Sequence, residues 1–207
     1  MSEPLAQHDG YACKLSVHPE TPNEFLSTGS DGKIFSIDIR ENGPNELFVL
    51  YEDERVVPLY SINSNPLNCN EFCVSGSSRY VRVYDRRNIL LPLYKFCPSH
   101  LVQNEDMYVP CAIYNYSGTE ILATYDNYIY LFDRLTPSST DYAHKYSSVT
   151  NSTIDIINFF GPKSEYVIGP SYDTIVIWDK NTETIVHETY ADEEGVEYFY
   201  IVNLFDN

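Results

Sequence analysis

Basic residues are scarce in this chain, and their scarcity restricts the partners that it can have. The 207 residues contain 13 Lys and Arg against 30 Asp and Glu, a formal net charge of −17. Binding to DNA, RNA or an anionic membrane depends on cations that neutralise phosphates. The composition therefore predicts no direct nucleic-acid partner and no membrane partner. The acidic residues that follow Lys180 are expected to form a solvated loop.

Long apolar runs and a cysteine framework are also missing. No stretch approaches the roughly 18 apolar residues of a membrane-spanning helix. Residues 1–4, Met-Ser-Glu-Pro, lack the basic start of a secretion signal. The cysteines are an odd number without regular spacing: Cys13, Cys69, Cys73, Cys97 and Cys111. Reduced, mostly buried thiols are the simplest interpretation, which predicts an intracellular protein of the nucleus or the cytoplasm.

Motifs that carry well-defined chemistry are absent as well. The sequence contains no Gly-rich phosphate loop, no His-Glu-x-x-His, no Gly-x-Ser-x-Gly and no Cys-x-x-Cys. Its histidines are scattered, and His18 precedes Pro19 at a predicted turn, where we expect a structural role. We therefore predict a non-catalytic protein without cofactor or metal. An enzyme with polar residues converging on a central channel is the least favoured alternative.

What the chain does contain is an internal repeat of about 47 residues. Phe25 and Phe72 are 47 residues apart, and so are Arg40 and Arg87. Each repeat closes on an aspartate after an apolar run, and these aspartates are Asp38, Asp85, Asp133 and Asp179. A fixed period of this size indicates one supersecondary unit that is copied and buries its faces against its neighbours.

Each repeat is predicted to hold four β-strands. Val, Ile, Phe and Tyr dominate the short runs, and turn residues such as Gly, Pro, Asn and Ser separate them. The expected strands are 12–17, 24–28, 33–38 and 47–51; 58–63, 71–75, 80–84 and 93–97; 109–115, 120–124, 128–132 and 142–146; and 154–159, 165–168, 174–178 and 184–190. The run 174–178 is apolar on both faces and therefore needs cover on both sides.

Four strands, this period and the pair Trp178-Asp179 are typical of a WD-repeat β-propeller, an all-β fold. A kelch propeller is disfavoured because the sequence has no Gly-Gly pair. We expect a lead-in over 1–11 and a partial propeller over 12–207. Its repeats are expected at about 12–51, 58–97, 109–146 and 154–190, with the first strand of a fifth at 196–207. Propellers close at about four to eight blades, and we predict an open arc of a seven-bladed ring rather than a closed ring of four.

Several residues have predicted structural roles in the repeat. Asp31 and Asp126 lie between the second and third strands of their repeats, where an aspartate caps a tight turn by accepting backbone N–H groups. Asp133, Trp178 and Asp179 are expected to end the third strands of the last two repeats.

The arginines that follow two of the closing aspartates are the candidate binding residues. Arg40 comes two residues after Asp38, and Arg87 comes two residues after Asp85. Because they occupy the same phase of adjacent repeats, we expect them side by side on one rim. Guanidinium groups are favoured anchors in protein interfaces. In the alternative interpretation each arginine pairs with Asp38 or Asp85, or with a neighbouring repeat, and only stiffens the corner.

The pattern of an apolar residue followed by Asp-x-Arg on two successive repeats resembles WD-repeat proteins that dock on the damaged-DNA-binding adaptor of cullin-4 ubiquitin ligases. The rest of the chain is most similar to the DDB- and cullin-associated factor 8 family. The similar stretches are 35–40, 81–87, 95–102, 117–123, 128–132 and 160–167. Phe-Cys-Pro at 96–98 and Gly-Pro-Lys-Ser-Glu at 161–165 are specific, because a generic WD repeat does not carry them.

The resemblance implies a non-catalytic substrate receptor. One rim would hold the adaptor of the cullin-4 ligase through Arg40 and Arg87, with Asp38 and Asp85 beside them. Other surfaces would capture protein substrates, and the transfer chemistry would belong to the partner subunits. The alternative is a general WD-repeat scaffold whose partners have no connection with ubiquitin.

Overall fold

The computed structural model describes residues 5–135, 141–147 and 153–191. They belong to two compact units, Met1–Ala112 and Ile113–Asn207, which divide the chain near the start of the third repeat. The described residues contain four four-stranded antiparallel sheets and one two-stranded sheet. Apart from a 3₁₀ turn at Ser99–Leu101, these residues form no helix, and none of them lies in a helix that is long and apolar enough to cross a membrane.

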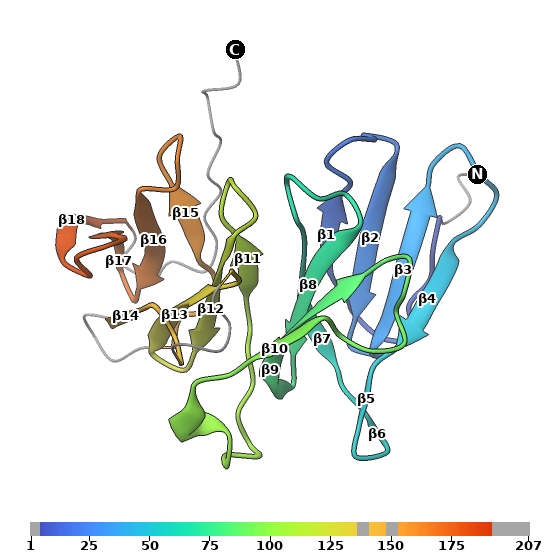
Figure 1. Ribbon diagram of the computed structural model, residues 1–207, viewed down its shortest axis with the longest axis horizontal. Coiled ribbons are helices and arrows are strands. Elements are labelled where there is room, and N and C mark those ends of the chain that lie inside the picture. Colours follow the sequence, from blue (N-terminus) through green and yellow to red (C-terminus); the bar gives the residue numbers. More distant parts are fainter. Residues whose placement is uncertain (1–4, 136–140, 148–152, 192–207) are drawn as a thin grey trace. The chain divides into compact units, whose positions relative to one another are not determined.

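The first unit contains two of the four-stranded sheets, which lie side by side in Figure 1. One is built from β1 (Ala12–Val17), β2 (Glu24–Gly29), β3 (Lys33–Asp38) and β4 (Asn45–Val49). The other is built from β7 (Leu59–Ser64), β8 (Glu71–Gly76), β9 (Ser78–Asp85) and β10 (Tyr94–Phe96). The short hairpin β5 (Tyr51–Glu52) and β6 (Arg55–Val56) connects them. In each sheet, consecutive strands are neighbours.

A shared apolar core joins the two sheets of the first unit. Every residue of β8 is buried. Since Phe72 and Val74 point to one face of the sheet and Cys73 and Ser75 to the other, both faces of this strand are covered. The core that includes β8 comprises Leu26, Ile34, Leu50, Val57, Leu59, Ile62, Phe72, Val74 and Tyr84. The Ser16 hydroxyl on β1 also accepts the Ser64 N–H on β7 over 2.8 Å.

Gly76 ends β8 at a point of very close backbone approach. A Cβ atom placed there would lie 2.0 Å from the Pro58 carbonyl oxygen and 2.8 Å from the Leu59 Cα. The Ser77 N–H donates to the same Pro58 carbonyl over 2.8 Å. Only glycine therefore lets the end of β8 pack against the start of β7.

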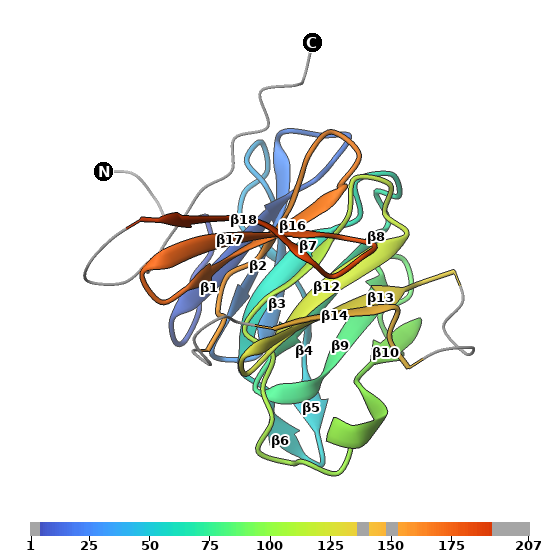
Figure 2. The ribbon, with the colours of Figure 1, turned by 90° about the vertical axis from the view of Figure 1, so that its left-hand side faces the viewer.

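The second unit contains two further four-stranded sheets, and most of their strands are labelled in Figure 2. One contains β11 (Ala112–Tyr114), β12 (Glu120–Tyr125), β13 (Tyr128–Asp133) and β14 (His144–Ser147). The other contains β15 (Asn158–Phe160), β16 (Tyr166–Ser171), β17 (Thr174–Asp179) and β18 (Ile185–Tyr190). The neighbouring strands from β12 to β14 and from β15 to β18 pair in antiparallel orientation.

Aromatic side chains connect the two sheets of the second unit. The rings of Tyr146 on β14 and Trp178 on β17 are both about 1% exposed, and their centroids lie 6.3 Å apart. The Tyr146 hydroxyl donates to the Lys180 carbonyl oxygen over 2.6 Å. Burial raises the pKa of the Tyr146 phenol, since water no longer solvates a phenolate there.

The run 174–178, which was predicted to be covered on both sides, is buried fully on one face and partly on the other. Val176 and Trp178 are buried, and Ile175 and Ile177 on the opposite face of β17 are partly buried. The neighbouring strand β18 is exposed along its whole length. The face of β17 that carries Val176 and Trp178 is therefore fully covered, and the opposite face is covered in part.

The all-β class and the repeated four-stranded sheets are confirmed. All sixteen expected strands occur, most of them within three residues of the predicted limits. The β5–β6 hairpin was not expected, and the strand predicted at 154–159 is shorter, at Asn158–Phe160. The predicted start of a fifth repeat at 196–207 lies outside the described residues.

Candidate functional site: two aspartate-held arginines and a bridging glutamate

The same corner closes the third strand in all four repeats. The closing aspartate uses one side-chain oxygen to accept the backbone N–H of the residue two positions later, which forms an Asx turn. These bonds join Asp38 to Arg40 over 2.9 Å, Asp85 to Arg87 over 2.9 Å, Asp133 to Leu135 over 2.8 Å and Asp179 to Asn181 over 3.0 Å. The predicted role of Asp133 and Asp179 at strand ends is thus a specific backbone contact.

In the first repeat the side chain at this corner forms a two-bonded ion pair. Arg40 Nε donates to Asp38 Oδ1 over 2.8 Å, and Arg40 Nη2 donates to Oδ2 over 2.5 Å. The planar guanidinium and carboxylate groups thus share two parallel bonds. These hydrogen bonds lower the pKa of Asp38 to about 2. The Arg40 side chain nevertheless stays 58% exposed.

The second repeat reproduces this geometry. Arg87 Nε donates to Asp85 Oδ1 over 3.0 Å, and Arg87 Nη2 donates to Oδ2 over 2.7 Å. The pKa of Asp85 falls to about 2 for the same reason, and the Arg87 side chain is 69% exposed. The third and fourth repeats have Leu135 and Asn181 at this position, so the paired corner belongs to the first unit.

The pairing leaves one edge of each guanidinium group available. A guanidinium has five N–H donors, and the aspartate engages Nε and one N–H of Nη2. In the part of the chain that the structure describes, Nη1 of Arg40 and Nη1 of Arg87 have no hydrogen-bond acceptor. Each aspartate therefore fixes the orientation of its arginine while the outer edge faces solvent. The pairing with Asp38 and Asp85 that one interpretation expected is present, and the role of Arg40 and Arg87 as interface anchors stays a prediction.

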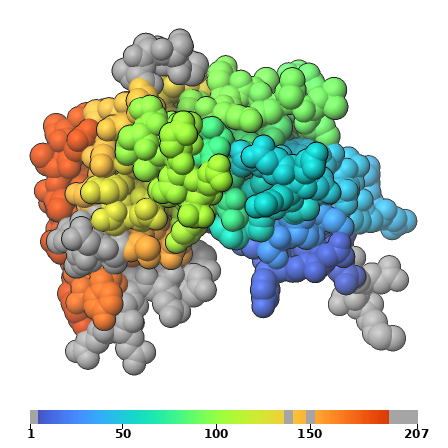
Figure 3. Space-filling view, turned by 90° about the horizontal axis from the view of Figure 1, so that it is seen from below, coloured from blue at the N-terminus to red at the C-terminus, as the bar shows by residue number. Residues whose placement is uncertain are grey.

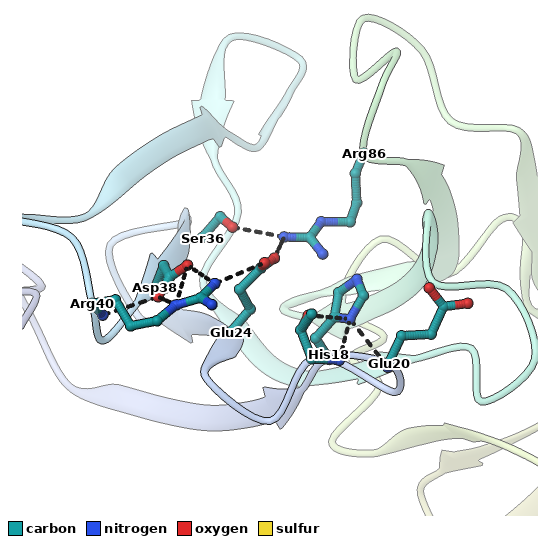
Figure 4. Close-up of polar contacts among 8 residues, drawn as sticks. His18, Glu20, Glu24, Ser36, Asp38, Arg40 and Arg86 are labelled. Carbon is teal, nitrogen blue, oxygen red and sulfur yellow. Dashed lines mark hydrogen bonds and ion pairs between the residues drawn. The ribbon is translucent and has the colours of Figure 1, made fainter.

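Glu24 links the first of these corners to the second repeat, as Figure 4 shows. One carboxylate oxygen of Glu24 lies 3.9 Å from Nη2 of Arg40, and the other lies 3.7 Å from Nη2 of Arg86. Arg86 also donates to the Ser36 hydroxyl over 2.7 Å. Arg86 is the immediate neighbour of Arg87, so one edge of the first unit carries side chains from both repeats.

Arg86 was not among the predicted site residues, although a signal for it exists. It follows the closing aspartate Asp85 directly, and Lys180 follows Asp179 in the same way. Lys180 Nζ donates to Glu120 Oε2 over 2.7 Å. Glu24 and Glu120 both begin the second strand of their sheets. The signal is a basic residue directly after the closing aspartate together with a glutamate at the start of the second strand of the preceding repeat. This pair of residues predicts a contact between the two adjacent sheets.

The turn aspartates differ from each other. Asp31 Oδ1 accepts the Lys33 N–H over 3.1 Å, and Oδ2 accepts the Asp9 N–H over 2.8 Å. Asp126 instead adopts a left-handed backbone conformation with φ of 52°, and its carboxylate forms no hydrogen bond with the residues that the structure describes. The expected side-chain cap is therefore found at Asp31, while Asp126 supplies only the backbone geometry of the turn.

His8 completes the environment of Asp31, and sequence reasoning missed it. Its Nδ1 lies 2.9 Å from Asp31 Oδ1, and its Nε2 lies 2.8 Å from the Ser27 hydroxyl. The ring also packs edge-on against Phe35 with centroids 4.9 Å apart. Burial acts to raise the pKa of Asp31, but the hydrogen bonds from His8 and the backbone outweigh it, so the net shift is downward.

His18 has the structural role that the sequence predicts. Its Nδ1 accepts the backbone N–H of Thr21 over 3.1 Å and also contacts the Thr21 hydroxyl at 2.7 Å. Among residues 5–135, 141–147 and 153–191, no group of three or more His, Cys, Asp or Glu side chains is arranged to hold a metal ion.

A comparison with models of known protein families found none that matches this chain.

Proposed function

We propose that this chain is a non-catalytic substrate receptor that binds the damaged-DNA-binding adaptor of a cullin-4 RING ubiquitin ligase. Arg40 and Arg87 bind the adaptor, held in place by Asp38 and Asp85, and other surfaces recruit the proteins to be ubiquitinated. The four sheets are blades of a WD-repeat β-propeller, an open arc of a seven-bladed ring. The protein acts inside the cell, in the nucleus or the cytoplasm.

The observation that carries the proposal is the matched geometry of the two arginines. Both are fixed by two bonds to an aspartate, and both keep Nη1 without an acceptor in the described residues. An arginine that is held before binding loses less side-chain freedom when a partner arrives. Its outer N–H groups can then donate to a carbonyl or carboxylate of the adaptor, which is how arginine contributes at interface hot spots.

Titration of the purified adaptor with the full chain tests this proposal by isothermal calorimetry. We expect the double variant R40A/R87A to weaken binding by at least about tenfold, since arginine anchors commonly contribute more than 1.4 kcal/mol. The variant R40K/R87K should also bind weakly, because lysine keeps the charge but not the planar fork. The matched control is Arg55→Ala, which removes another exposed arginine of the first unit, on β6.

A second candidate function is a general propeller scaffold whose partners are unrelated to ubiquitin. The two-bonded pairs favour it, because an arginine bound to its own aspartate also stiffens a corner without any partner. This candidate predicts that a folded R40A/R87A variant binds the adaptor as the unmodified chain does, or that neither binds. Either outcome would remove the adaptor-binding role assigned to Arg40 and Arg87.

A further inference from the structure

The loop that follows Arg87 exposes an unusual amount of apolar side chain. It connects β9 to β10, and its leucines are 88% exposed at Leu90, 76% at Leu91 and 49% at Leu93. In the space-filling view, the green part of the chain around residue 90 lies on the open surface of the first unit (Figure 3). Single exposed leucines are ordinary, but adjacent exposed leucines on one loop indicate a contact surface.

The first repeat supplies an internal comparison for this loop. Its counterpart connects β3 to β4 through Glu41-Asn42-Gly43-Pro44, which carries no large apolar side chain and is exposed. Both loops begin at the same aspartate corner. A loop at this position therefore needs no apolar side chains in order to fold. The leucines of the second repeat contribute little to the core and call for another explanation.

The backbone holds the loop in a defined position. The Asn88 N–H donates to the Asp85 carbonyl oxygen over 2.9 Å, and the Leu93 N–H donates to the Val83 carbonyl oxygen over 2.7 Å. Pro92 further restricts the chain between these anchors. Leu90 and Leu91 are thus presented from fixed ends, three and four residues after the oriented guanidinium group of Arg87.

We infer that the loop 89–93 is part of the adaptor-binding edge, and that Leu90 and Leu91 insert into an apolar pocket of the adaptor. Arg87 Nη1 then donates to a carbonyl or carboxylate oxygen on the rim of that pocket. An apolar centre flanked by an arginine is the composition of an interface hot spot. The occupant is the adaptor, because the leucines are continuous in the chain with Arg87. This inference rests on the proposed function and adds a specificity element to the same site.

The test measures adaptor binding by the full chain and by surface variants, again by calorimetry. We expect L90D/L91D to weaken binding by at least about tenfold, because a charge cannot enter an apolar pocket. The control is Leu67→Asp, at another exposed leucine of the first unit, 73% exposed; it should leave affinity within about twofold. Thermal melts by circular dichroism verify that each variant is folded. The milder L90A/L91A tests the same contact without an added charge.

The possible outcomes separate this inference from the proposed function. If the unmodified chain binds the adaptor and both leucine variants bind as tightly as Leu67→Asp, the inference is wrong and the proposed function stands. If the unmodified chain does not bind, both are wrong. If the leucine variants bind weakly while the control does not, the loop belongs to the interface. Coupling between Arg87→Ala and L90A/L91A would then place both groups in one contact.

Discussion

Lys180 Nζ lies 2.7 Å from Glu120 Oε2 and joins the last two sheets of the described chain. Arg86 and Glu24 occupy the equivalent repeat positions in the first unit, at 3.7 Å. In these two cases the residue after the closing aspartate reaches back to the glutamate that begins the second strand of the preceding sheet of the same unit. The repeat encodes a contact between sheets as well as the strands within each sheet.

A double-mutant cycle can measure this contact. We expect Lys180→Met and Glu120→Gln to show a coupling free energy of about 1 kcal/mol, the upper range for a pair that is still partly solvated. Glutamine can keep the hydrogen bond that Asn115 donates to Glu120, so the cycle isolates the ion pair. Urea unfolding followed by the fluorescence of Trp178, the only tryptophan, gives the free energies. Lys163→Met, at an exposed turn, is the control; additive effects of Lys180→Met and Glu120→Gln would contradict the prediction.

The aspartate corners predict that the free energy of unfolding depends on pH in the acid range. Asp38 and Asp85 have folded pKa values of about 2, below the ordinary value of 3.8. Between these values the unfolded chain binds more protons than the folded one, so stability rises with pH through this window. The contribution is complete above about pH 4 and is lost as the pH falls to about 2. Carboxylate NMR titration should find both groups ionised at pH 3.

Removing the arginine provides the matching control for that titration. In Arg40→Ala we expect the pKa of Asp38 to rise toward 3.8 while the pKa of Asp85 stays about 2. The residual lowering of Asp38 comes from the backbone N–H of residue 40, which any residue except proline retains. Equal values for Asp38 in the variant and in the unmodified chain would show that the guanidinium is not the cause.

His8 is expected to stabilise the first unit even though it precedes β1. Because an ionised carboxylate can only accept, His8 Nδ1–H donates to Asp31, and Nε2 accepts from the Ser27 hydroxyl when the ring is neutral. His8→Ala leaves Asp31 without this donor, at a site where both side chains are less than 10% exposed. We expect a loss of about 2 kcal/mol in urea unfolding. His187→Ala, on the exposed strand β18, should change stability by less than about 0.5 kcal/mol.

Gly76 and Gly43 make a pair of variants that separates steric conflict from backbone strain. Gly76→Ala places a methyl group 2.0 Å from the Pro58 carbonyl oxygen, and we expect it to destabilise the protein by about 3 kcal/mol. Gly43→Ala meets no atom within 4 Å but must adopt φ of about 91°, which costs about 1–2 kcal/mol. Circular dichroism of thermal unfolding should rank Gly76→Ala as the less stable variant. The opposite order would mean that β8 shifts easily at its end.

The strands could be predicted because the sequence repeats itself. Short runs rich in Val, Ile, Phe and Tyr between turn residues placed β8 and β13 to within one or two residues, and the copies at intervals of about 47 residues supported each other. The β5–β6 hairpin escaped because its turn uses Asp53 and Glu54 with φ of 49° and 64°. Such turns normally carry asparagine or glycine, and glutamate gives no turn signal.

The candidate site shows where sequence reasoning stops. The spacing from Asp38 to Arg40 suggested an ion pair, but spacing could not decide between a paired and an exposed arginine, since that depends on which N–H groups the aspartate engages. His8 was missed because it stands apart from the strand that it supports. Its partners Ser27 and Asp31 are 19 and 23 residues away, and only the folded chain brings them together.

The aspartate corner has a consequence for how the repeat can change over evolutionary time. Its stabilising bond uses the main-chain amide of the second residue after the aspartate and makes no demand on that residue's side chain. Arginine, leucine and asparagine all occupy the position here without altering the turn. Substitution there can create or erase an outward chemical handle while the architecture stays intact, and proline alone is forbidden, because it has no amide hydrogen to give.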